Sequence, residues 1–251
     1  MSKFKVVLTD NIFPDLDIER KMLAAVDAEL VEVTDPATLA DEVKDADAVI
    51  NTYAQLEPEL IEGMKKCRLI IRNGIGLNTI DVDTCNKKGI MVGNIPTYCI
   101  EEVATHAIAH MLTLNRKMLT YDKSVRTGVW DVKIGLPIHS VVGAVLGLVG
   151  FGKIPRLVNE RAKALGMKVI AYDPFVTAED AASVGAEKVE MDEILKRSDF
   201  ISIHCPLTPD TRGMFDYEAF KKMKDTAYLI NTARGPIINE PELVKALEEG
   251  I

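Results

Sequence analysis

The chain has 251 residues, of which 47% are hydrophobic, and a formal net charge of -8. This length and composition exclude a disordered protein and allow one large core or two medium ones. The negative charge disfavours a nucleic-acid or anionic-membrane surface, although a local cationic pocket for an acidic ligand is compatible with it.

Neither a membrane span nor a signal peptide is indicated. No run of about 18 apolar residues is present, and the start, MSKFKVVLTD, lacks the basic-then-apolar layout of a signal peptide. We therefore expect a cytoplasmic protein that has no membrane partner. The four cysteines lie far apart without a CxxC pair, which argues against zinc and against a disulfide scaffold; they are Cys67, Cys85, Cys99 and Cys205.

Two series of strand-like runs follow one another along the chain. The first comprises FKVVLT, ELVEV, DAVIN, RLIIR and IMVGN, separated by stretches of helical spacing such as LDIERKMLAAVDA. The second comprises AVLGLVG, MKVIAY, EKVE, DFISIH and TAYLIN. Strands that alternate with helices predict an α/β fold with two doubly wound parallel-sheet domains. We place the boundary near residue 100, giving domains 1–100 and 101–251.

Residues 101–119 between the two series predict a mostly buried helix. The positions that suggest burial are Val103, Ala107, Ala109, His110, Leu112 and Leu114. The stretch from Tyr121 to Pro137, which includes Trp130, reads as irregular and amphipathic. An arm used in self-association and a simple surface excursion remain equally open for it.

A glycine loop joins the run AVLGLVG to a helical stretch. Gly150 permits a tight turn, and Gly152 lets backbone N–H groups approach a pyrophosphate at the start of the helix. Asp173, at the end of the next strand, is placed to bond a ribose 2'-hydroxyl and to repel a 2'-phosphate, which favours NAD over NADP. Pro155 replaces the third glycine of the fingerprint, and it suits a first helical turn. The alternative is an ordinary turn between a strand and a helix.

The segment LINTARGP, residues 229–236, indicates a buried strand that ends on a cation. Arg234 follows small and polar residues, so it should emerge at the carboxyl end of the strand, where open α/β sheets bind ligands. The alternative is a plain surface arginine.

Several motifs together resemble the D-isomer specific 2-hydroxyacid dehydrogenase family. They are the glycine loop with Asp173, SIHCPLTPDTRG, INTARGPIINEPELVKAL, RNGIGLNTIDVDTCNKKGI and NIPTYCIEEVATHAIAHML. The last of these is similar to the branch of the C-terminal-binding proteins. The resemblance covers nearly the whole chain and implies a flavodoxin-like substrate domain, a Rossmann NAD-binding domain, a site between them and a homodimer with a contact near Trp130.

The resemblance also implies roles for single residues. Arg234 matches the arginine that holds the substrate carboxylate and carbonyl. The loop of Gly74, Ile75 and Gly76 matches the one whose N–H groups receive that carboxylate, with a mere turn as the alternative. Positions that match the cofactor site are Gly150, Gly152, Lys153, Ile154, Asp173, His204, Pro206, Thr232 and Ala233, and we add Val103 to them.

The proton donor of the family is a histidine that is hydrogen-bonded to a glutamate. Both matching positions would fall after Ile251, so the resemblance implies an incomplete chain whose NAD-binding domain lacks its last strands. Of the histidines present, His204 is better explained by packing or hydrogen bonding than by catalysis. His106 and His110 have a metal-ligand spacing without a third ligand, and packing explains them better than a metal.

The substrate class follows from the loop NTYAQ, residues 51–55, which carries no cation. Family members that act on 3-phosphoglycerate have basic side chains there, so we expect a small unphosphorylated 2-keto or 2-hydroxy acid. Asn51 and Tyr53 are candidate contacts, with turn and packing roles equally open. The rival hypotheses are an NADH-responsive binding protein and a fragment that only binds nucleotide.

Overall fold

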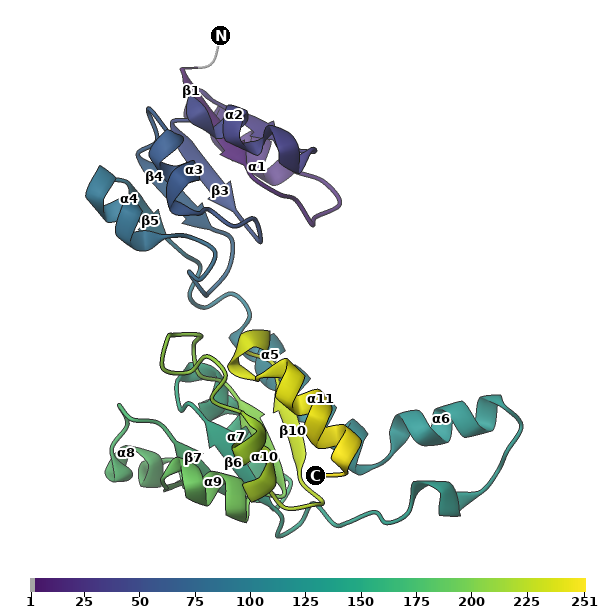
Figure 1. Cartoon of the computed structure of the whole chain (residues 1–251). Helices are drawn as coiled ribbons and strands as arrows, with labels where there is room; N and C mark the ends of the chain where they lie inside the picture. Colours follow the sequence, from purple (N-terminus) through teal and green to yellow (C-terminus); the bar gives the residue numbers. More distant parts are fainter. Residues whose placement is uncertain (1–2) are drawn as a thin grey trace. The chain divides into compact units, whose positions relative to one another are not determined.

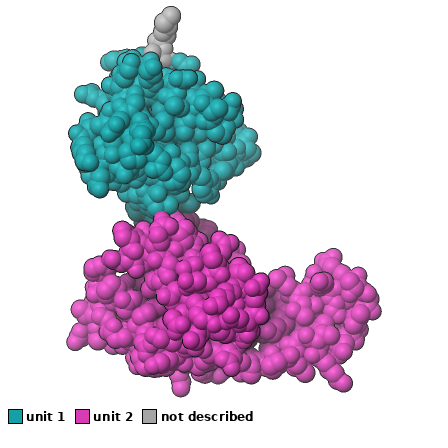
Figure 2. Space-filling model, viewed as in Figure 1, with its two compact units in different colours: residues 1–98 teal, residues 99–251 magenta. Residues whose placement is uncertain are grey.

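The computed structural model describes residues 3–251. The chain divides into two compact units between Tyr98 and Cys99, shown in teal and magenta in Figure 2. Each unit contains one five-stranded sheet of parallel strands, and the predicted α/β fold with two parallel sheets is confirmed.

The first unit is built on the strand order β2-β1-β3-β4-β5, which is the flavodoxin-like order. Its strands correspond to the five runs expected from the sequence: β1 (Phe4–Leu8), β2 (Ala28–Glu32), β3 (Ala48–Asn51), β4 (Leu69–Arg72) and β5 (Met91–Gly93). The helical segments are α1 (Asp17–Ala24), η1 (Pro36–Thr38), α2 (Leu39–Lys44), α3 (Pro58–Gly63) and α4 (Val82–Lys88).

Apolar side chains from the middle of these strands form the core of the first unit. Val7, Val49 and Ile70 are fully buried on three adjacent strands, and Ile61 of α3 packs against them. Because the central strands are covered on both faces, they are nearly continuously apolar, as parallel strands are. Their polar residues are therefore confined to the strand ends.

The second unit has the strand order β10-β9-β6-β7-β8, which matches the first five positions of the Rossmann order 3-2-1-4-5-6. Its strands are β6 (Val145–Val149), β7 (Lys168–Tyr172), β8 (Glu187–Lys188), β9 (Phe200–Ile203) and β10 (Tyr228–Asn231). Its helical segments are α5 (Ile100–Asn115), α6 (Met118–Arg126), η2 (Val132–Gly135), α7 (Lys153–Ala164), α8 (Ala178–Ser183), α9 (Met191–Arg197), α10 (Tyr217–Lys222), η3 (Gly235–Ile237) and α11 (Glu240–Glu249).

The helix expected over residues 101–119 ends earlier and buries a different stripe. Helix α5 stops at Asn115, and Lys117 has a left-handed φ of 54° before α6 begins. The residues that α5 buries are Ala104, Ala107, Met111 and Asn115. The prediction of burial was wrong for Ala109, His110 and Leu114, which are exposed. No helix among residues 3–251 is long and apolar enough to cross a membrane.

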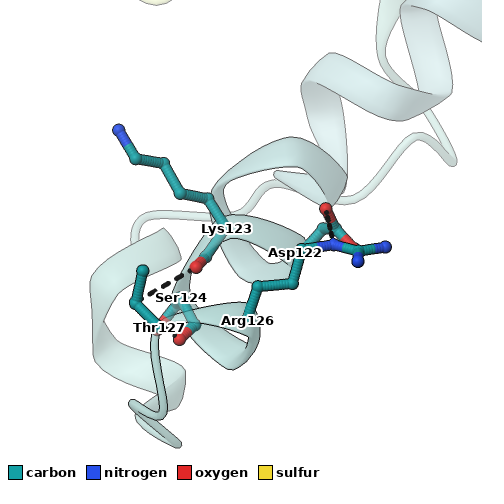
Figure 3. Close-up of polar contacts among 5 residues, drawn as sticks. All are labelled: Asp122, Lys123, Ser124, Arg126 and Thr127. Atoms are coloured by element: carbon teal, nitrogen blue, oxygen red, sulfur yellow. Dashed lines mark hydrogen bonds and ion pairs between the residues drawn. The ribbon is translucent and has the colours of Figure 1, made fainter.

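Residues 118–136 form an arm that extends from the body of the second unit (Figures 1 and 2). The expectation of an irregular stretch was wrong for its first part, because α6 is a regular helix through Arg126. Figure 3 shows how this helix is held at its end: Arg126 pairs with Asp122 at 2.9 Å, and the Thr127 hydroxyl donates to the carbonyl of Ser124 at 2.9 Å.

Candidate functional site

The carboxyl ends of the parallel strands gather the predicted residues of the second unit at one sheet edge. Strand β6 lies between β7 and β9. The chain therefore continues from β6 to one side of the sheet, through β7 and β8, and then crosses to the other side of β6 to form β9 and β10. Gly150 follows β6, Asp173 follows β7, His204 follows β9, and Thr232 and Arg234 follow β10. Open α/β sheets bind ligands at such a switch point.

Gly150 is held directly against the end of strand β9. Its φ is +92°, and a Cβ atom at this position would lie 2.8 Å from the backbone nitrogen of Cys205. The Gly150 N–H also donates to the carbonyl of Tyr172 at 2.8 Å. Only glycine suits both the backbone conformation and the close approach.

Helix α7 begins with unused hydrogen-bond donors. Its N-cap is Gly152, and no side chain caps it, whereas α4 and α8 are capped by side chains. Among the described residues, the N–H groups of Gly152, Lys153 and Ile154 donate to no acceptor. The first turn carries no acidic residue, and a Cβ on Gly152 would have nothing within 4 Å. These features suit an anion at the start of the helix.

Asp173 is fixed beside this loop by two backbone donors. Its Oδ2 atom accepts from the N–H of Phe151 at 2.8 Å, and its Oδ1 atom accepts from the N–H of Phe175 at 2.8 Å. Each carboxylate oxygen retains a lone pair for a further donor. The carboxylate is therefore oriented and still able to accept a hydroxyl group.

The turn after β10 is organised by Asn231. Its Nδ2 atom donates to the carbonyl of Arg234 at 2.9 Å, and its Oδ1 atom accepts from the N–H of Ala233 at 2.9 Å. The Arg234 Nη1 atom donates to the carbonyl of Ala233 at 2.8 Å. Between them, the hydroxyl of Thr232 is buried and has no hydrogen-bond partner. A ligand at this edge would supply that partner.

His204 is suited to hydrogen bonding rather than to acid catalysis. Its Nε2 atom lies 2.8 Å from the Ser202 hydroxyl, and burial lowers the pKa of the ring to about 4. Burial also raises the pKa of the neighbouring Cys205 thiol. At neutral pH the imidazole is thus uncharged and the thiol is protonated.

The pair His106 and His110 is exposed on α5, with 2.9 Å between the two Nε2 atoms. Their packing is an edge-to-face contact between the two rings, whose centroids lie 4.2 Å apart. Within residues 3–251 no group of three or more metal-ligand side chains is assembled.

The loop after β4 in the first unit also presents unused donors. The carbonyls of Gly74 and Ile75 accept hydrogen bonds from residues 94–95, from the Ile95 N–H at 3.0 Å and the Asn94 side chain at 2.7 Å. In contrast, the N–H groups of Ile75, Gly76 and Leu77 donate to no acceptor in the described part of the chain. Successive free N–H groups in a turn form an anion-binding concavity.

Asn51 and Tyr53 occupy different environments at the end of β3. Asn51 is fully buried, and its amide bonds the Thr9 hydroxyl (3.2 Å), the Ala54 carbonyl (2.7 Å) and the Thr79 hydroxyl (2.8 Å). This arrangement favours the turn and packing role that the sequence left open for Asn51. Tyr53 is 60% exposed and remains a candidate contact.

Asp10 organises the same loop and was not identified from the sequence as a residue of the site. Its carboxylate accepts from the Thr9 hydroxyl (2.6 Å) and from the N–H groups of Thr52 (3.1 Å), Tyr53 (2.7 Å) and Ala54 (3.3 Å). Burial raises the pKa of Asp10, but these hydrogen bonds outweigh it, so the pKa is lowered. An acid two residues after a buried apolar strand is the signal that could have revealed it.

Sequence comparison identifies this arrangement. The model described as "D-isomer specific 2-hydroxyacid dehydrogenase, NAD binding domain" matches residues 108–251. The chain belongs to this family. The resemblance drawn from the motifs is thereby confirmed, and the second unit carries the family's NAD-binding domain.

Curated relatives in the family extend beyond the matched region. The chain is 36% identical over 226 residues to the D-3-phosphoglycerate dehydrogenase of Mycobacterium leprae (strain TN), covering 90% of this chain and 43% of the relative. It is 35% identical over 216 residues to the glyoxylate reductase of Korarchaeum cryptofilum (strain OPF8), covering 84% of this chain and 65% of the relative. The chain thus spans less than half the length of the phosphoglycerate dehydrogenase.

Solved structures of the family match both units. The D-lactate dehydrogenase from Aquifex aeolicus, solved with NAD and lactic acid, superimposes with a TM-score of 0.88 and 34% identity, covering 98% of this chain and 74% of that one. The NAD-dependent formate dehydrogenase from Staphylococcus aureus, solved with NAD, gives a TM-score of 0.89 and 28% identity, covering 98% and 78%.

Several features of the second unit of this family member suit NAD. The uncapped start of α7 suits a pyrophosphate, Gly152 leaves open space for its approach, and the buried Thr232 hydroxyl needs a partner. Asp173 is held in an orientation that suits a ribose hydroxyl. These residues are therefore suited to hold the nucleotide, and their assignment as its site stays a prediction.

The remaining matched residues have less distinctive surroundings. Lys153 is exposed and Ile154 is half-buried at the start of α7, while Val103 is half-buried near the start of α5. Pro206 is exposed, and its carbonyl accepts from the Thr211 hydroxyl at 2.6 Å. Cofactor contacts for these four residues stay predictions.

Proposed function

We propose that the protein is an NAD-dependent oxidoreductase that interconverts a small 2-keto acid and its D-2-hydroxy acid. One observation carries the proposal: the nucleotide features of the second unit and a permanent cation, Arg234, lie at the same edge of one sheet. A site with this composition can hold a nucleotide and an acidic substrate together.

In this proposal Arg234 binds the carboxylate and the carbonyl oxygen of the substrate. A guanidinium group donates two parallel hydrogen bonds and stays charged at all relevant pH values. It therefore orients the carbonyl carbon for hydride addition and stabilises the negative charge that develops on the oxygen. The bonds of Asn231 to Ala233 and Arg234 keep this turn in place.

The loop of Gly74, Ile75 and Gly76 is proposed to receive the substrate carboxylate. Its support is the set of N–H groups at residues 75–77 without acceptors. The first unit, residues 1–100, would then be the substrate domain, and Tyr53 stays the proposed side-chain contact at the end of β3. Glyoxylate, pyruvate and hydroxypyruvate are the 2-keto acids to compare as substrates.

The carbonyl oxygen needs a proton as hydride reaches the carbon. His204 is not a suitable donor, because its pKa of about 4 leaves it neutral at pH 7. We keep the expectation drawn from the resemblance that a histidine paired with a glutamate, outside residues 1–251, donates this proton.

A homodimer formed through the arm is part of the proposal. The arm carries large apolar side chains that nothing in its own unit covers, including Leu119, Trp130 and Val132, which are 72%, 91% and 69% exposed. A second copy of the chain would cover such a surface. A cytoplasmic location stays a prediction.

The test is NADH oxidation by the complete product of the gene with a panel of 2-keto acids. We expect turnover of at least one panel member, and a loss of about 100-fold or more in kcat/KM for Arg234→Ala, since a transition-state contact is removed. Tight NADH binding without turnover of any compound would overturn the enzyme proposal and favour an NADH-responsive binding protein.

A further inference from the structure

A groove in the second unit is lined mainly by basic and polar side chains. It has a volume of about 320 Å³ and lies between α7 and Val184, the residue that follows α8. Its basic lining residues are Lys153, Arg156 and Lys163, and its acidic one is Glu160. Within residues 3–251 no ion pair involves any of these four side chains. The groove therefore has an excess of positive charge, although the chain as a whole is acidic.

Two of the three cations are held in place by their surroundings. The Lys163 Nζ atom donates to the carbonyl of Val184 at 2.8 Å, and a Cβ atom at Gly185, whose φ is +75°, would collide with this ammonium group. The Arg156 guanidinium lies 5.0 Å from the centroid of the Phe151 ring, which is a cation–π contact. Cations that are already positioned lose less side-chain entropy when an anion binds than mobile ones do.

Asn159 adds an unsatisfied acceptor to the lining of the groove. It is 1% exposed, and its Nδ2 atom donates to the carbonyl of Val184 at 3.0 Å, which fixes the orientation of the amide. Its Oδ1 atom is buried and has no hydrogen-bond partner among the described residues. A buried acceptor without a donor is unfavourable. A ligand that has both anionic oxygens and an O–H group would satisfy the cations and this acceptor together.

We propose that the groove binds the phosphate group of a small molecule. Arg156 and Lys163 hold the phosphate oxygens, as arginine and lysine commonly do, and Asn159 accepts a hydrogen bond from an O–H group of the ligand. Inorganic phosphate has a P–OH group at neutral pH, and glycerol 3-phosphate has hydroxyl groups on its carbon skeleton. The proposal does not depend on the dehydrogenase function. The alternative is that these side chains are only the solvated face of an amphipathic helix.

Arg156→Met and Lys163→Met separate these explanations, because methionine keeps an apolar stem and removes the charge. Lys168→Met is the matched control: Lys168 is exposed, begins β7 of the same unit and does not line the groove, so this variant loses the same charge elsewhere. All three variants are first compared with the unmodified protein by far-ultraviolet circular dichroism and thermal melting.

Phosphate binding is then measured by titrating inorganic phosphate into the protein in a calorimeter at low salt. The protein is saturated with NADH, so that phosphate does not occupy the start of α7. We expect Arg156→Met and Lys163→Met each to weaken phosphate binding about 10-fold, as for loss of a charged hydrogen bond. Arg156→Lys should retain more affinity than Arg156→Met, because it keeps the charge. Lys168→Met should stay within twofold of the unmodified protein, and NADH affinity should stay within twofold in every variant.

Sulfate and glycerol 3-phosphate complete the experiment. Sulfate has anionic oxygens without an O–H group at neutral pH, so it should bind more weakly than phosphate. Tighter binding of glycerol 3-phosphate would identify a phosphorylated metabolite as the ligand, and tighter binding of inorganic phosphate would identify the free ion. Equal affinity for sulfate would overturn the role of Asn159 and the assignment to phosphate. Absence of phosphate binding, or an equal loss in Lys168→Met, would overturn the site itself.

Discussion

Replacing Gly150 with alanine tests how the glycine loop is built. The added methyl group would lie 2.8 Å from the Cys205 nitrogen and 2.9 Å from the His204 carbonyl carbon. Both are backbone atoms, and the strand that precedes them pairs with β6. Relief therefore requires a shift of the loop or of the strand end rather than a side-chain rotation.

The expected loss of stability has two parts. A non-glycine residue at the φ of +92° costs about 1–2 kcal/mol, and overpacking against fixed atoms adds about 1–2 kcal/mol. The sum is about 3 kcal/mol. For a unit of this size, such a loss lowers the melting temperature by about 6–12 °C.

Two glycine variants serve as controls in thermal melts followed by calorimetry. Gly213→Ala places an alanine at a φ of +66°, and its Cβ atom would have no atom within 4 Å. This variant should therefore lose only the stability that the backbone conformation costs. Gly152→Ala has neither a positive φ nor a close neighbour; it should melt within about 1 kcal/mol of the unmodified protein yet weaken NAD binding. If Gly150→Ala is no less stable than Gly213→Ala, the close approach to β9 does not constrain this position and the reasoning is refuted.

Three further predictions concern the pH response, the nucleotide and the arm. The pKa of His204 is about 4 in the folded protein and 6.5 ordinarily, so the unfolded chain binds more protons between these two pH values. The free energy of unfolding should therefore fall by up to about 3 kcal/mol as the pH drops from 6.5 to 4. In denaturant titrations this fall should be smaller for His204→Gln, and an equal fall would show that the pKa of His204 is not lowered. In fluorescence titrations, Asp173→Asn should weaken NADH binding and reduce the ratio of the NADH affinity to the NADPH affinity. An unchanged NADPH affinity would show that the carboxylate does not select the nucleotide. Trp130→Ser should shift the protein toward the monomer in analytical ultracentrifugation, and an unchanged mass would exclude the arm as the main contact.

The fold was predictable because its strands carry a strong local signal. Parallel strands covered on both faces are short apolar runs, and each of the ten runs expected from the sequence overlaps an observed strand. The alternation with helical spacing then limits the topology to doubly wound sheets. Strand order within each sheet followed from the family resemblance and not from the pattern.

Helix α5 shows where the pattern fails. Its buried stripe includes Asn115, whose Nδ2 atom donates to the carbonyl of His139 at 3.2 Å. The spacing of apolar residues cannot reveal a buried polar residue. With Asn115 left out, a stripe that includes His110 and Leu114 fitted the spacing equally well, but it lies on the exposed face. The end of the helix depended on the left-handed backbone at Lys117, which side-chain polarity does not encode.

The polar residues at the strand ends were the hardest to assign. Asn51 and Tyr53 are two positions apart in one loop, yet the first is enclosed by hydrogen bonds and the second faces solvent. Only the pairing with Thr79 and with the loop around Asp10 decides between them, and these contacts join segments far apart in the sequence. Residue type and spacing alone leave both as candidates.

Both units present backbone N–H groups without an acceptor at the carboxyl ends of their strands. In a chain of net charge -8, the proposed anion sites consist of backbone N–H groups without an acceptor at the ends of parallel strands, at residues 152–154 in one unit and 75–77 in the other. Such donors are fixed by the fold and do not have to be ordered when a ligand binds. In the second unit a guanidinium, that of Arg234, also follows strand β10. Because neither the backbone N–H groups nor this guanidinium titrates near neutral pH, we expect anion binding to persist across the neutral pH range. Any change in turnover over that range should then come from the proton donor.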